Sequence, residues 1–260
     1  IAGQVREFTE SPYVYRISGK RILIGMYSFE EYEAVLQKLL RYFSHPIAME
    51  GEEILFSAAI CGIPYGNQLG SENLLNYVGY LTALVPRTQE TLLVRGDEYV
   101  KHGFLRRKTI EAYLYRAIEE DLFEVYYQPI VDCVSGRVIG AEALMRYTMV
   151  TEEGKEWLSP VEFIPLLEKT GLIIPAGRFV LNEAAKMCRE IQQYIPEFSV
   201  NVNISCYQIE HGKIADKILT AVRDNGLMPD RICIEMTESG FMDMTPVFCK
   251  FRKVLEENGI

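Results

Sequence analysis

The amino-acid sequence predicts an α/β fold over most of the chain, preceded by a smaller α+β segment. From Phe123 onward, short apolar runs alternate with segments of helical periodicity, which is typical of a parallel or mostly parallel sheet covered by helices. Before residue 100 the order is instead hairpin, helix, strand, helix and strand. The 260 residues, 48% of them hydrophobic, are enough for one large domain or two modest ones.

The composition argues against several functional classes. The net charge of -9 disfavours non-specific binding to a nucleic-acid polymer or an anionic membrane. The six cysteines have no metal-ligand spacing, which indicates reduced thiols in a cytoplasmic protein. No apolar run is long enough to span a membrane, and no signal peptide is visible. We interpret the chain as a fragment of a longer parent protein, whose upstream part is free to hold a sensor or a membrane anchor.

The first elements expected are a hairpin and a helix. Two apolar runs, Val14–Ile17 and Arg21–Met26, flank the turn residues 18–20. Ser28 and Glu31 have the spacing of a capping box, and an apolar stripe at helical spacing follows them. The remaining elements of this segment are a strand, a helix and a strand: Glu53–Ile60, Ser71–Leu84 and Thr91–Val94.

A basic run, Lys101–His102 and Arg106–Lys108, opens the next helix. It is too short, and too poor in interleaved aromatic residues, to indicate a nucleic-acid interface, so we interpret it as a solvated linker face. From Thr109 to Asp121 the helix carries one apolar stripe. We therefore expect a domain at residues 1–100, a linker helix at 101–121 and a second domain at 122–260.

The second domain is expected to open with two antiparallel strands, Glu124–Val131 and Arg137–Tyr147, because only a tight turn separates them. Ser159, followed by Pro160, is a strong helix start, and Gly171 ends that helix. The later elements are a helix over Pro175–Tyr194, a strand over Phe198–Ile204, a helix ending near Asn225-Gly226, a strand over Arg231–Met236, and a helix beginning near Thr245 and running to the end of the chain.

Charged side chains fall on one face of the second strand. Alternate residues of a strand share a face, so Glu142, Leu144 and Arg146 point one way while Ala141 and Ala143 point the other. Charged groups are almost never buried unless they are paired or bound to a ligand or metal. This pattern is unusual for a strand that serves only the core.

The other strands agree in phase with this one. Gln128, Asn203 and Glu235 also lie opposite to apolar, mostly β-branched faces, near the ends of their strands. β/α barrels keep their active sites at the carboxyl ends of their strands. If the sheet curls into a barrel, Glu142, Asn203 and Glu235 converge as three oxygen ligands. Oxygen-only ligation suits a hard cation, Mg²⁺ or Mn²⁺, rather than zinc.

Four sequence blocks together resemble one known family. Glu142-Ala143-Leu144-Met145-Arg146 follows Tyr126-Tyr127-Gln128-Pro129-Ile130 by a short hairpin, and the blocks 202–205 and 234–239 come later. In this order and spacing they resemble the EAL family of cyclic-di-GMP phosphodiesterases, over roughly Leu105 to the end. The resemblance implies a modified β/α (TIM-like) barrel, truncated at its C-terminal end. The family's paired Asp motif and general-base Lys would lie beyond Ile260, so the fragment alone is expected to be inactive.

The resemblance also implies roles for individual residues. It makes Glu142, Asn203 and Glu235 the ligands of Mg²⁺ or Mn²⁺, and Glu142, Glu235 and Glu238 the catalytic set, with Glu238 ordering a neighbouring loop. Arg146 would contact a substrate phosphate, because a guanidinium binds phosphate oxygens bidentately. Gln128 and Leu144 would line the dinucleotide site. The implied reaction hydrolyses one phosphodiester of cyclic-di-GMP to the linear dinucleotide. A homodimer through the EAL domain is a further expectation.

The first segment resembles the C-terminal half of a GGDEF domain, the family that makes cyclic-di-GMP. The family's signature would stand at residues 18–22, where Lys20 and Arg21 replace its two acidic residues. That chemistry needs carboxylates to hold a divalent cation. The family's inhibitory Arg-x-x-Asp motif is also absent from Thr9–Pro12. We expect a degenerate domain kept for packing, dimer contacts or regulation, with nucleotide binding through Lys20 and Arg21 as the alternative.

Two other functions stay open at this point. One is a receptor that binds cyclic-di-GMP, or only a protein partner, without turnover. The other is a glycosidase barrel in which Glu142 and Glu235 form a carboxylate pair. The single tryptophan, Trp157, gives the glycosidase no evident aromatic platform for a sugar.

Overall fold

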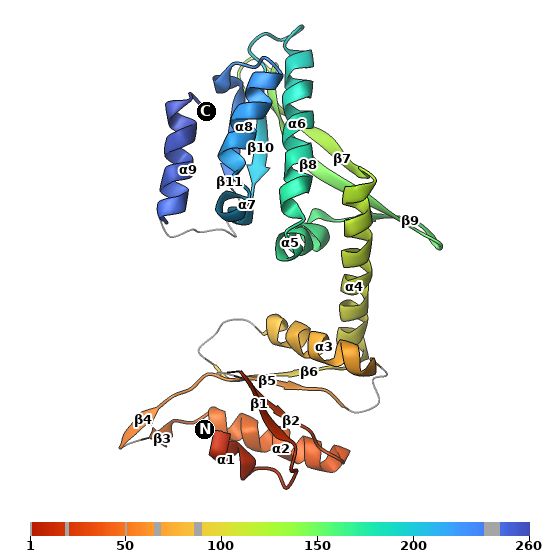
Figure 1. Ribbon diagram of the computed structural model, residues 1–260, viewed down its shortest axis with the longest axis vertical. Helices are drawn as coiled ribbons and strands as arrows, with labels where there is room; N and C mark the ends of the chain where they lie inside the picture. Colours follow the sequence, from red (N-terminus) through yellow and green to blue (C-terminus); the bar gives the residue numbers. More distant parts are fainter. Residues whose placement is uncertain (1, 19–20, 50, 65–68, 86–89, 237–244) are drawn as a thin grey trace. The chain divides into compact units, whose positions relative to one another are not determined.

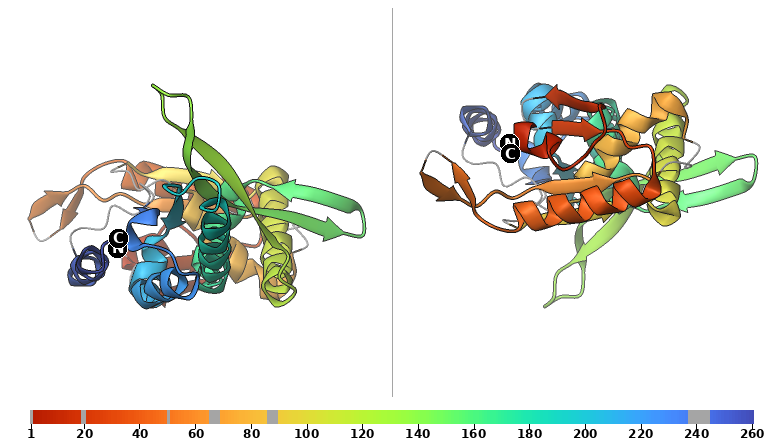
Figure 2. Two further views of the ribbon diagram at one scale, coloured as in Figure 1. Left: turned by 90° about the horizontal axis from the view of Figure 1, so that it is seen from above. Right: turned by 90° about the horizontal axis from the view of Figure 1, so that it is seen from below.

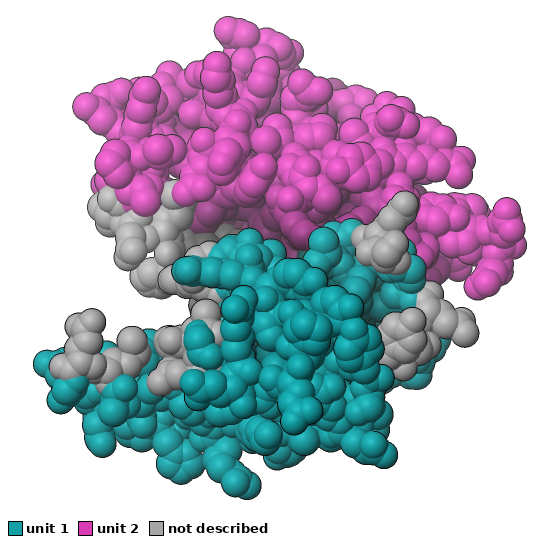
Figure 3. Space-filling view, turned by 60° about the horizontal axis from the view of Figure 1, so that its bottom comes forward, with its two compact units in different colours: residues 1–108 teal, residues 109–260 magenta. Residues whose placement is uncertain are grey.

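The computed structural model describes residues 2–18, 21–49, 51–64, 69–85, 90–236 and 245–260 (Figure 1). Two residues to which we assigned roles, Lys20 and Glu238, lie outside these ranges. The chain divides into two compact units, Ile1–Lys108 and Thr109–Ile260, which Figure 3 shows in different colours. None of the helices in the described ranges has the length and apolar character needed to cross a bilayer.

The first unit contains short strands in three pairs and two longer helices. Its elements are α1 (Ala2–Arg6), β1 (Val14–Ser18), β2 (Arg21–Ile24), α2 (Phe29–Phe43), β3 (Ile47–Met49), β4 (Glu52–Ile54), β5 (Ala59–Gly62), α3 (Gly70–Leu84), β6 (Leu92–Arg95) and the start of α4 (Glu98–Glu119). β1 and β2 form the expected antiparallel hairpin. β3 pairs antiparallel with β4, and β5 pairs parallel with β6.

The expected single strand over Glu53–Ile60 is wrong. Gly51 has a φ of 92°, a left-handed conformation open to glycine, and the chain turns back there so that β4 pairs with β3. β5 starts only at Ala59 and pairs with a different strand, β6. A hairpin and a separate strand therefore replace the continuous strand.

Half of the expected capping box at α2 is present. The Ser28 hydroxyl accepts a hydrogen bond from the Glu31 backbone N–H at 3.0 Å. The Glu31 carboxylate accepts instead from the Thr9 hydroxyl at 2.7 Å, which ties the preceding segment to the helix. The predicted apolar stripe is buried at Tyr32, Val35, Leu36 and Leu39.

Helix α4 begins at Glu98, slightly before the linker helix expected over residues 101–121, and part of its basic run is paired. The Lys101 ammonium lies 3.3 Å from the Glu98 carboxylate, one turn away. The Lys108 ammonium donates a hydrogen bond to the Asn73 side chain on α3 at 2.6 Å. These contacts give Lys101 and Lys108 a structural role within the first unit.

The second unit is one sheet with helices packed on it. Its elements after α4 are β7 (Phe123–Val131), β8 (Val138–Thr151), β9 (Gly154–Leu158), α5 (Pro160–Thr170), α6 (Ile173–Ile191), β10 (Ser199–Ile204), α7 (Cys206–His211), α8 (Ile214–Asp224), the 3₁₀ turn η1 (Pro229–Arg231), β11 (Ile232–Met236) and α9 (Pro246–Glu257). The strand order is β11-β10-β8-β7, and β9 pairs with β8. β8, β10 and β11 are parallel, whereas β7 is antiparallel to β8 as expected.

Three details of this unit differ from the expectation. β8 continues to Thr151 and pairs with β9 in a second hairpin, where Gly154 provides a left-handed turn residue. Two helices, α7 and α8, follow β10, where the sequence predicts one helix that ends near Asn225-Gly226. Helix α9 does not run to the end of the chain, because it ends at Glu257 with Asn258 as its cap.

One face of the sheet forms the main core of the unit. Helices α6 and α8 lie side by side on this face (Figures 1 and 2). Most of the residues that the alternation assigns to it are buried: Ala141, Ala143, Val200, Val202, Ile204 and Ile232. Met145 and Ile234 are partly buried, whereas Met236 at the end of β11 is 46% exposed. The opposite face therefore carries the polar alternates of the same strands.

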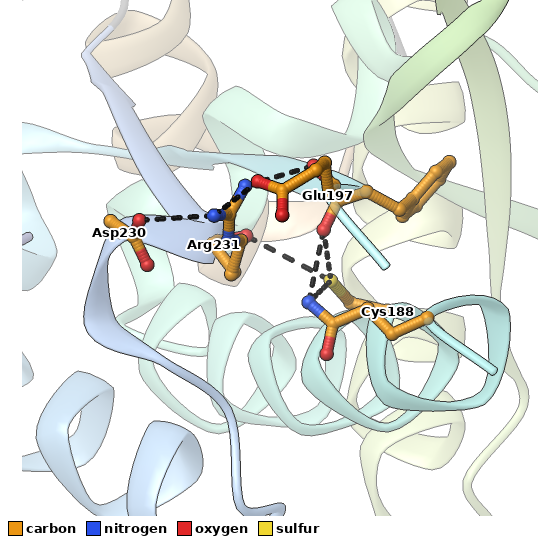
Figure 4. A network of polar contacts seen from close by, with 6 residues as sticks. Cys188, Glu197, Asp230 and Arg231 are labelled. Atoms are coloured by element: carbon orange, nitrogen blue, oxygen red, sulfur yellow. Dashed lines mark hydrogen bonds and ion pairs between the residues drawn. The ribbon is translucent and has the colours of Figure 1, made fainter. Parts of the chain in front are cut away.

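A polar network holds β10 and β11 together at their amino ends (Figure 4). The Arg231 guanidinium lies 2.5 Å from the Glu197 carboxylate and 3.3 Å from that of Asp230. Behind it, the buried Cys188 thiol donates to the Phe198 carbonyl at 3.5 Å. The amino ends of β/α strands serve stability rather than chemistry, so this network fixes the strands whose other ends carry the candidate site.

Candidate active site

The antiparallel pairing of β7 with β8 places the first polar residues of the candidate site next to one another. Gln128 stands directly opposite Glu142, and Tyr126 directly opposite Leu144. Directly opposed residues of antiparallel strands point to the same side of the sheet. All four side chains therefore share the face that helices α6 and α8 leave uncovered.

Strand β10 lies between the two carboxylate strands and contacts both. The Asn203 amide nitrogen donates to Glu142 Oε1 on β8 at 2.7 Å. The Asn201 amide nitrogen donates to Glu235 Oε1 on β11 at 2.5 Å. Each asparagine thus holds one carboxylate, and the two carboxylates belong to opposite neighbours of the same strand.

This arrangement brings the negative charges of two carboxylates to partly buried positions on one face of the sheet. Glu142, Asn203 and Glu235 are each partly buried, so their oxygen atoms are less hydrated than surface groups. Amide donors offset part of this charge, but they carry no formal positive charge. Burial, with the charge of Glu235 beside it, raises the pKa of the Cys233 thiol on the same strand. The face is therefore suited to receive a cation.

Arg146 supplies a positive charge on the same face of β8 as Glu142. One guanidinium nitrogen donates to the Met145 carbonyl at 2.9 Å, and the guanidinium carbon lies 5.8 Å from the centre of the Tyr126 ring. Within the described ranges it forms no ion pair. A guanidinium has five N–H donors in a fixed fork, so donors remain for an anionic ligand.

The predicted site residues differ in how closely the fold brings them together. Asn203 and Glu142 are in direct contact, and Glu235 joins them through Asn201. Gln128 is exposed beside Glu142, and Leu144 is half-buried on the same face. The structure does not describe Glu238, so its expected role stays a prediction.

Two residues of this face were not among the predicted site residues, Asn201 and Tyr126. Both have the same strand phase as predicted residues, Asn201 with Asn203 and Tyr126 with Gln128. The alternation along a strand does not distinguish these two residues from others on the same face, because their contacts depend on the stagger between neighbouring strands. Asn201 reaches diagonally to Glu235, although its register partner is Cys233.

The turn after β10 is fixed by a complete capping box. Gln208 N–H donates to the Ser205 hydroxyl at 3.4 Å, and Ser205 N–H donates to the Gln208 side-chain oxygen at 3.0 Å. The Gln208 side chain is buried against Gly177 of α6, where an added Cβ would lie 2.0 Å from its nitrogen. This packing fixes the carboxyl end of β10, two residues beyond Asn203.

Comparison with known families identifies the family of the second unit. Residues 111–260 match the EAL domain family. The chain belongs to that family. It is 28% identical to the bifunctional diguanylate cyclase/cyclic di-GMP phosphodiesterase MucR of Pseudomonas aeruginosa, an alignment that covers 88% of this chain and 34% of MucR. It is also 28% identical to the cyclic di-GMP phosphodiesterase PA2567 of the same organism, over 92% of this chain and 40% of that protein.

A solved EAL structure supports the fold as well. The MucR phosphodiesterase in complex with c-di-GMP superposes with a TM-score of 0.52 and 30% identity, covering 58% of this chain and 61% of that one. The predicted EAL membership and the α/β fold of the EAL barrel family are thereby confirmed. The chain spans about a third of the length of the first curated relatives it matches, from 29% to 34%. The GGDEF-like identity of the first segment stays a prediction.

Proposed function

We propose that the protein containing this EAL chain hydrolyses cyclic-di-GMP to the linear dinucleotide in a reaction that depends on a divalent cation. One observation carries the proposal. The two carboxylates of Glu142 and Glu235 are held by amides on one face of the sheet, on the same face as an arginine that has no carboxylate partner among the described residues. The names of the relatives support the choice of substrate.

The residues present fit a hard cation. Glu142 and Glu235 offer carboxylate oxygens and Asn203 an amide oxygen, and these are the donors that Mg²⁺ and Mn²⁺ prefer. The described residues contain no group of three His, Cys, Asp or Glu side chains placed to hold a metal, so the amide is needed to complete the set. When bound, the cation would lower the pKa of a water and balance charge on the phosphate.

The chain's own residues would place the substrate. The Arg146 guanidinium would bind a phosphate oxygen pair, because its fork matches phosphate geometry. Gln128, exposed and opposite Glu142, would donate a hydrogen bond to the dinucleotide or accept one from it. Leu144, between Glu142 and Arg146 on the strand, would provide an apolar wall. Orienting the scissile phosphodiester in this way removes part of the entropic barrier to attack.

The first unit would regulate the EAL domain rather than make cyclic-di-GMP. Arg21, at the start of β2, stands where a cyclase of the GGDEF type would need a carboxylate. The MucR alignment covers more of this chain than residues 111–260 provide, which supports a common two-part organisation. We propose a degenerate regulatory domain for residues 1–100.

The deciding experiment measures cyclic-di-GMP hydrolysis by the intact protein with Mg²⁺, with Mn²⁺ and with a chelator. Release of the linear dinucleotide that stops on chelation supports the proposal. Binding of the nucleotide without turnover would favour the receptor, and would reject the enzyme. A glycosidase would be indicated only by metal-independent turnover of a glycoside.

A further inference from the structure

We propose that Tyr126 is a substrate-contacting residue, whose exposed ring stacks on a guanine base of cyclic-di-GMP next to the phosphate bound by Arg146. The inference rests on the proposed function and extends it to the recognition of the base. It assigns a role to a residue that the sequence motif alone left without one.

The register of β7 places Tyr126 at the right level of the site. β7 is antiparallel to β8, and Tyr126 stands opposite Leu144, between Glu142 and Arg146. β/α barrels keep their active sites at the carboxyl ends of their strands, and Tyr126 lies nearer to that end of β8 than Gln128 does. It shares the polar face with all of these residues.

The ring is already in contact with the phosphate-binding group. The Arg146 guanidinium carbon lies 5.8 Å from the ring centre, within the range of a cation–π interaction. Directly opposite Arg146 stands Glu124, yet no ion pair between them is present. The ring thus restrains the guanidinium without neutralising it, which keeps its charge for an anion.

The fold itself makes little use of this side chain. Tyr126 is 56% exposed, and its hydroxyl has no hydrogen bond to the described residues. The next residue, Tyr127, points to the opposite face, packs against the core and donates from its hydroxyl to the Glu183 carbonyl at 3.1 Å. Tyr127 therefore serves packing, while the Tyr126 ring remains available to a ligand.

A cation beside an aromatic ring matches the chemistry of a nucleotide. Every base has a π face that stacks on an aromatic side chain, and such stacking is commonly worth about a tenfold change in affinity or more. The sugar places base and phosphate close together in the ligand, as the strand register places Tyr126 and Arg146 close together in the protein. One nucleotide half of cyclic-di-GMP would thus be bound at two points.

The test compares Tyr126→Ile with Tyr126→Phe in the intact protein. Isoleucine keeps strand propensity but removes the aromatic face. We expect Tyr126→Ile to raise KM for cyclic-di-GMP about tenfold, with kcat within about threefold of wild type. Tyr126→Phe keeps the face, so its KM should stay within about twofold. Tyr194→Ile, which replaces a tyrosine that is 83% exposed in the loop before β10, is the matched control and should change neither value.

Inorganic phosphate separates a base contact from an effect on Arg146. As a competitive inhibitor it has no base, so its inhibition constant should be unchanged in Tyr126→Ile. An unchanged KM for cyclic-di-GMP, or an equal weakening of cyclic-di-GMP and phosphate, would overturn the base contact. Turnover by the wild type is measured first, because its absence rejects the proposed function. Tyr126 is then judged by equilibrium binding of cyclic-di-GMP to the same variants.

Discussion

Asn203 on β10 donates a hydrogen bond of 2.7 Å to the Glu142 carboxylate on β8. The two residues come from sequence blocks 61 positions apart, and parallel pairing of β8 with β10 brings their strands together. The same strand reaches the other way through Asn201, which contacts Glu235. β10 therefore orders both carboxylates of the candidate site from its central position.

Replacing Arg146 by lysine should weaken the enzyme although the charge is kept. Lysine cannot form the bidentate contact with a phosphate, and it cannot stack on Tyr126 in the same way. We expect kcat/KM for cyclic-di-GMP to fall by about tenfold to a hundredfold. Arg137→Lys, at the exposed turn before β8, is the control. Equal activity of Arg146→Lys and wild type would show that the guanidinium does not bind the substrate.

Removing the Asn201 amide should weaken metal binding more than substrate binding. The amide orients Glu235. Mutation of residues that orient metal ligands commonly lowers metal affinity by about tenfold to a hundredfold. Calorimetric titration of Asn201→Ala with Mn²⁺ should show a loss of this size, whereas Asn182→Ala, exposed on α6, should bind as wild type does. Unchanged Mn²⁺ affinity in Asn201→Ala would mean that the contact with Glu235 has no functional role.

Alternation along single strands is enough to predict which face of the sheet Gln128, Glu142, Leu144, Arg146, Asn203 and Glu235 occupy. Ala141 and Ala143 are buried while Glu142 between them is only partly buried, as a period of two requires. The contacts between strands could not be predicted in the same way, because they depend on stagger. Asn201 is the clearest case, since its register partner is Cys233 and its hydrogen-bond partner is Glu235.

The predicted elements failed where a local turn changed the direction of the chain. Gly51 lies in the turn of the β3–β4 hairpin, and Gly154 lies in the turn of the β8–β9 hairpin. The apolar content of these segments alone does not predict either turn. Long, strongly periodic helices such as α2 were predicted closely, because a buried stripe and a capping serine agree. The short helix α7 has too few residues for its periodicity to be visible.

Substituting Gly177 should reveal how tightly the end of β10 is packed. An alanine Cβ would lie 2.0 Å from the buried Gln208 nitrogen, so the capping box must shift. We expect Gly177→Ala to lower the free energy of unfolding by about 1–3 kcal/mol in urea denaturation. Gly79→Ala, on α3 with no atom within 4 Å of the new Cβ, should raise it by about 0.5–1 kcal/mol. The same sign for both variants would contradict this packing.

The buried Cys188 should react slowly with alkylating reagents. Burial raises its pKa to about 11, although nearby Arg231 acts to lower it, so the thiol stays protonated at pH 8. Because this pKa lies above the ordinary value of 9.0, the contribution of Cys188 to stability is complete below pH 9 and declines as the pH rises toward 11. Mass spectrometry after iodoacetamide treatment at pH 8 should find Cys133, which is exposed, modified well before Cys188. Equal rates would show that the α6 packing is open.

The most direct test of the site compares cyclic-di-GMP turnover by wild type and Glu142→Ala in the intact protein, with Mn²⁺ and with Mg²⁺. Glu152→Ala, an exposed carboxylate in the β8–β9 turn, is the control. We expect metal-dependent release of the linear dinucleotide by the wild type and the control, and none by Glu142→Ala. Metal-dependent hydrolysis that survives in Glu142→Ala would contradict the assignment of this face of the sheet as the active site.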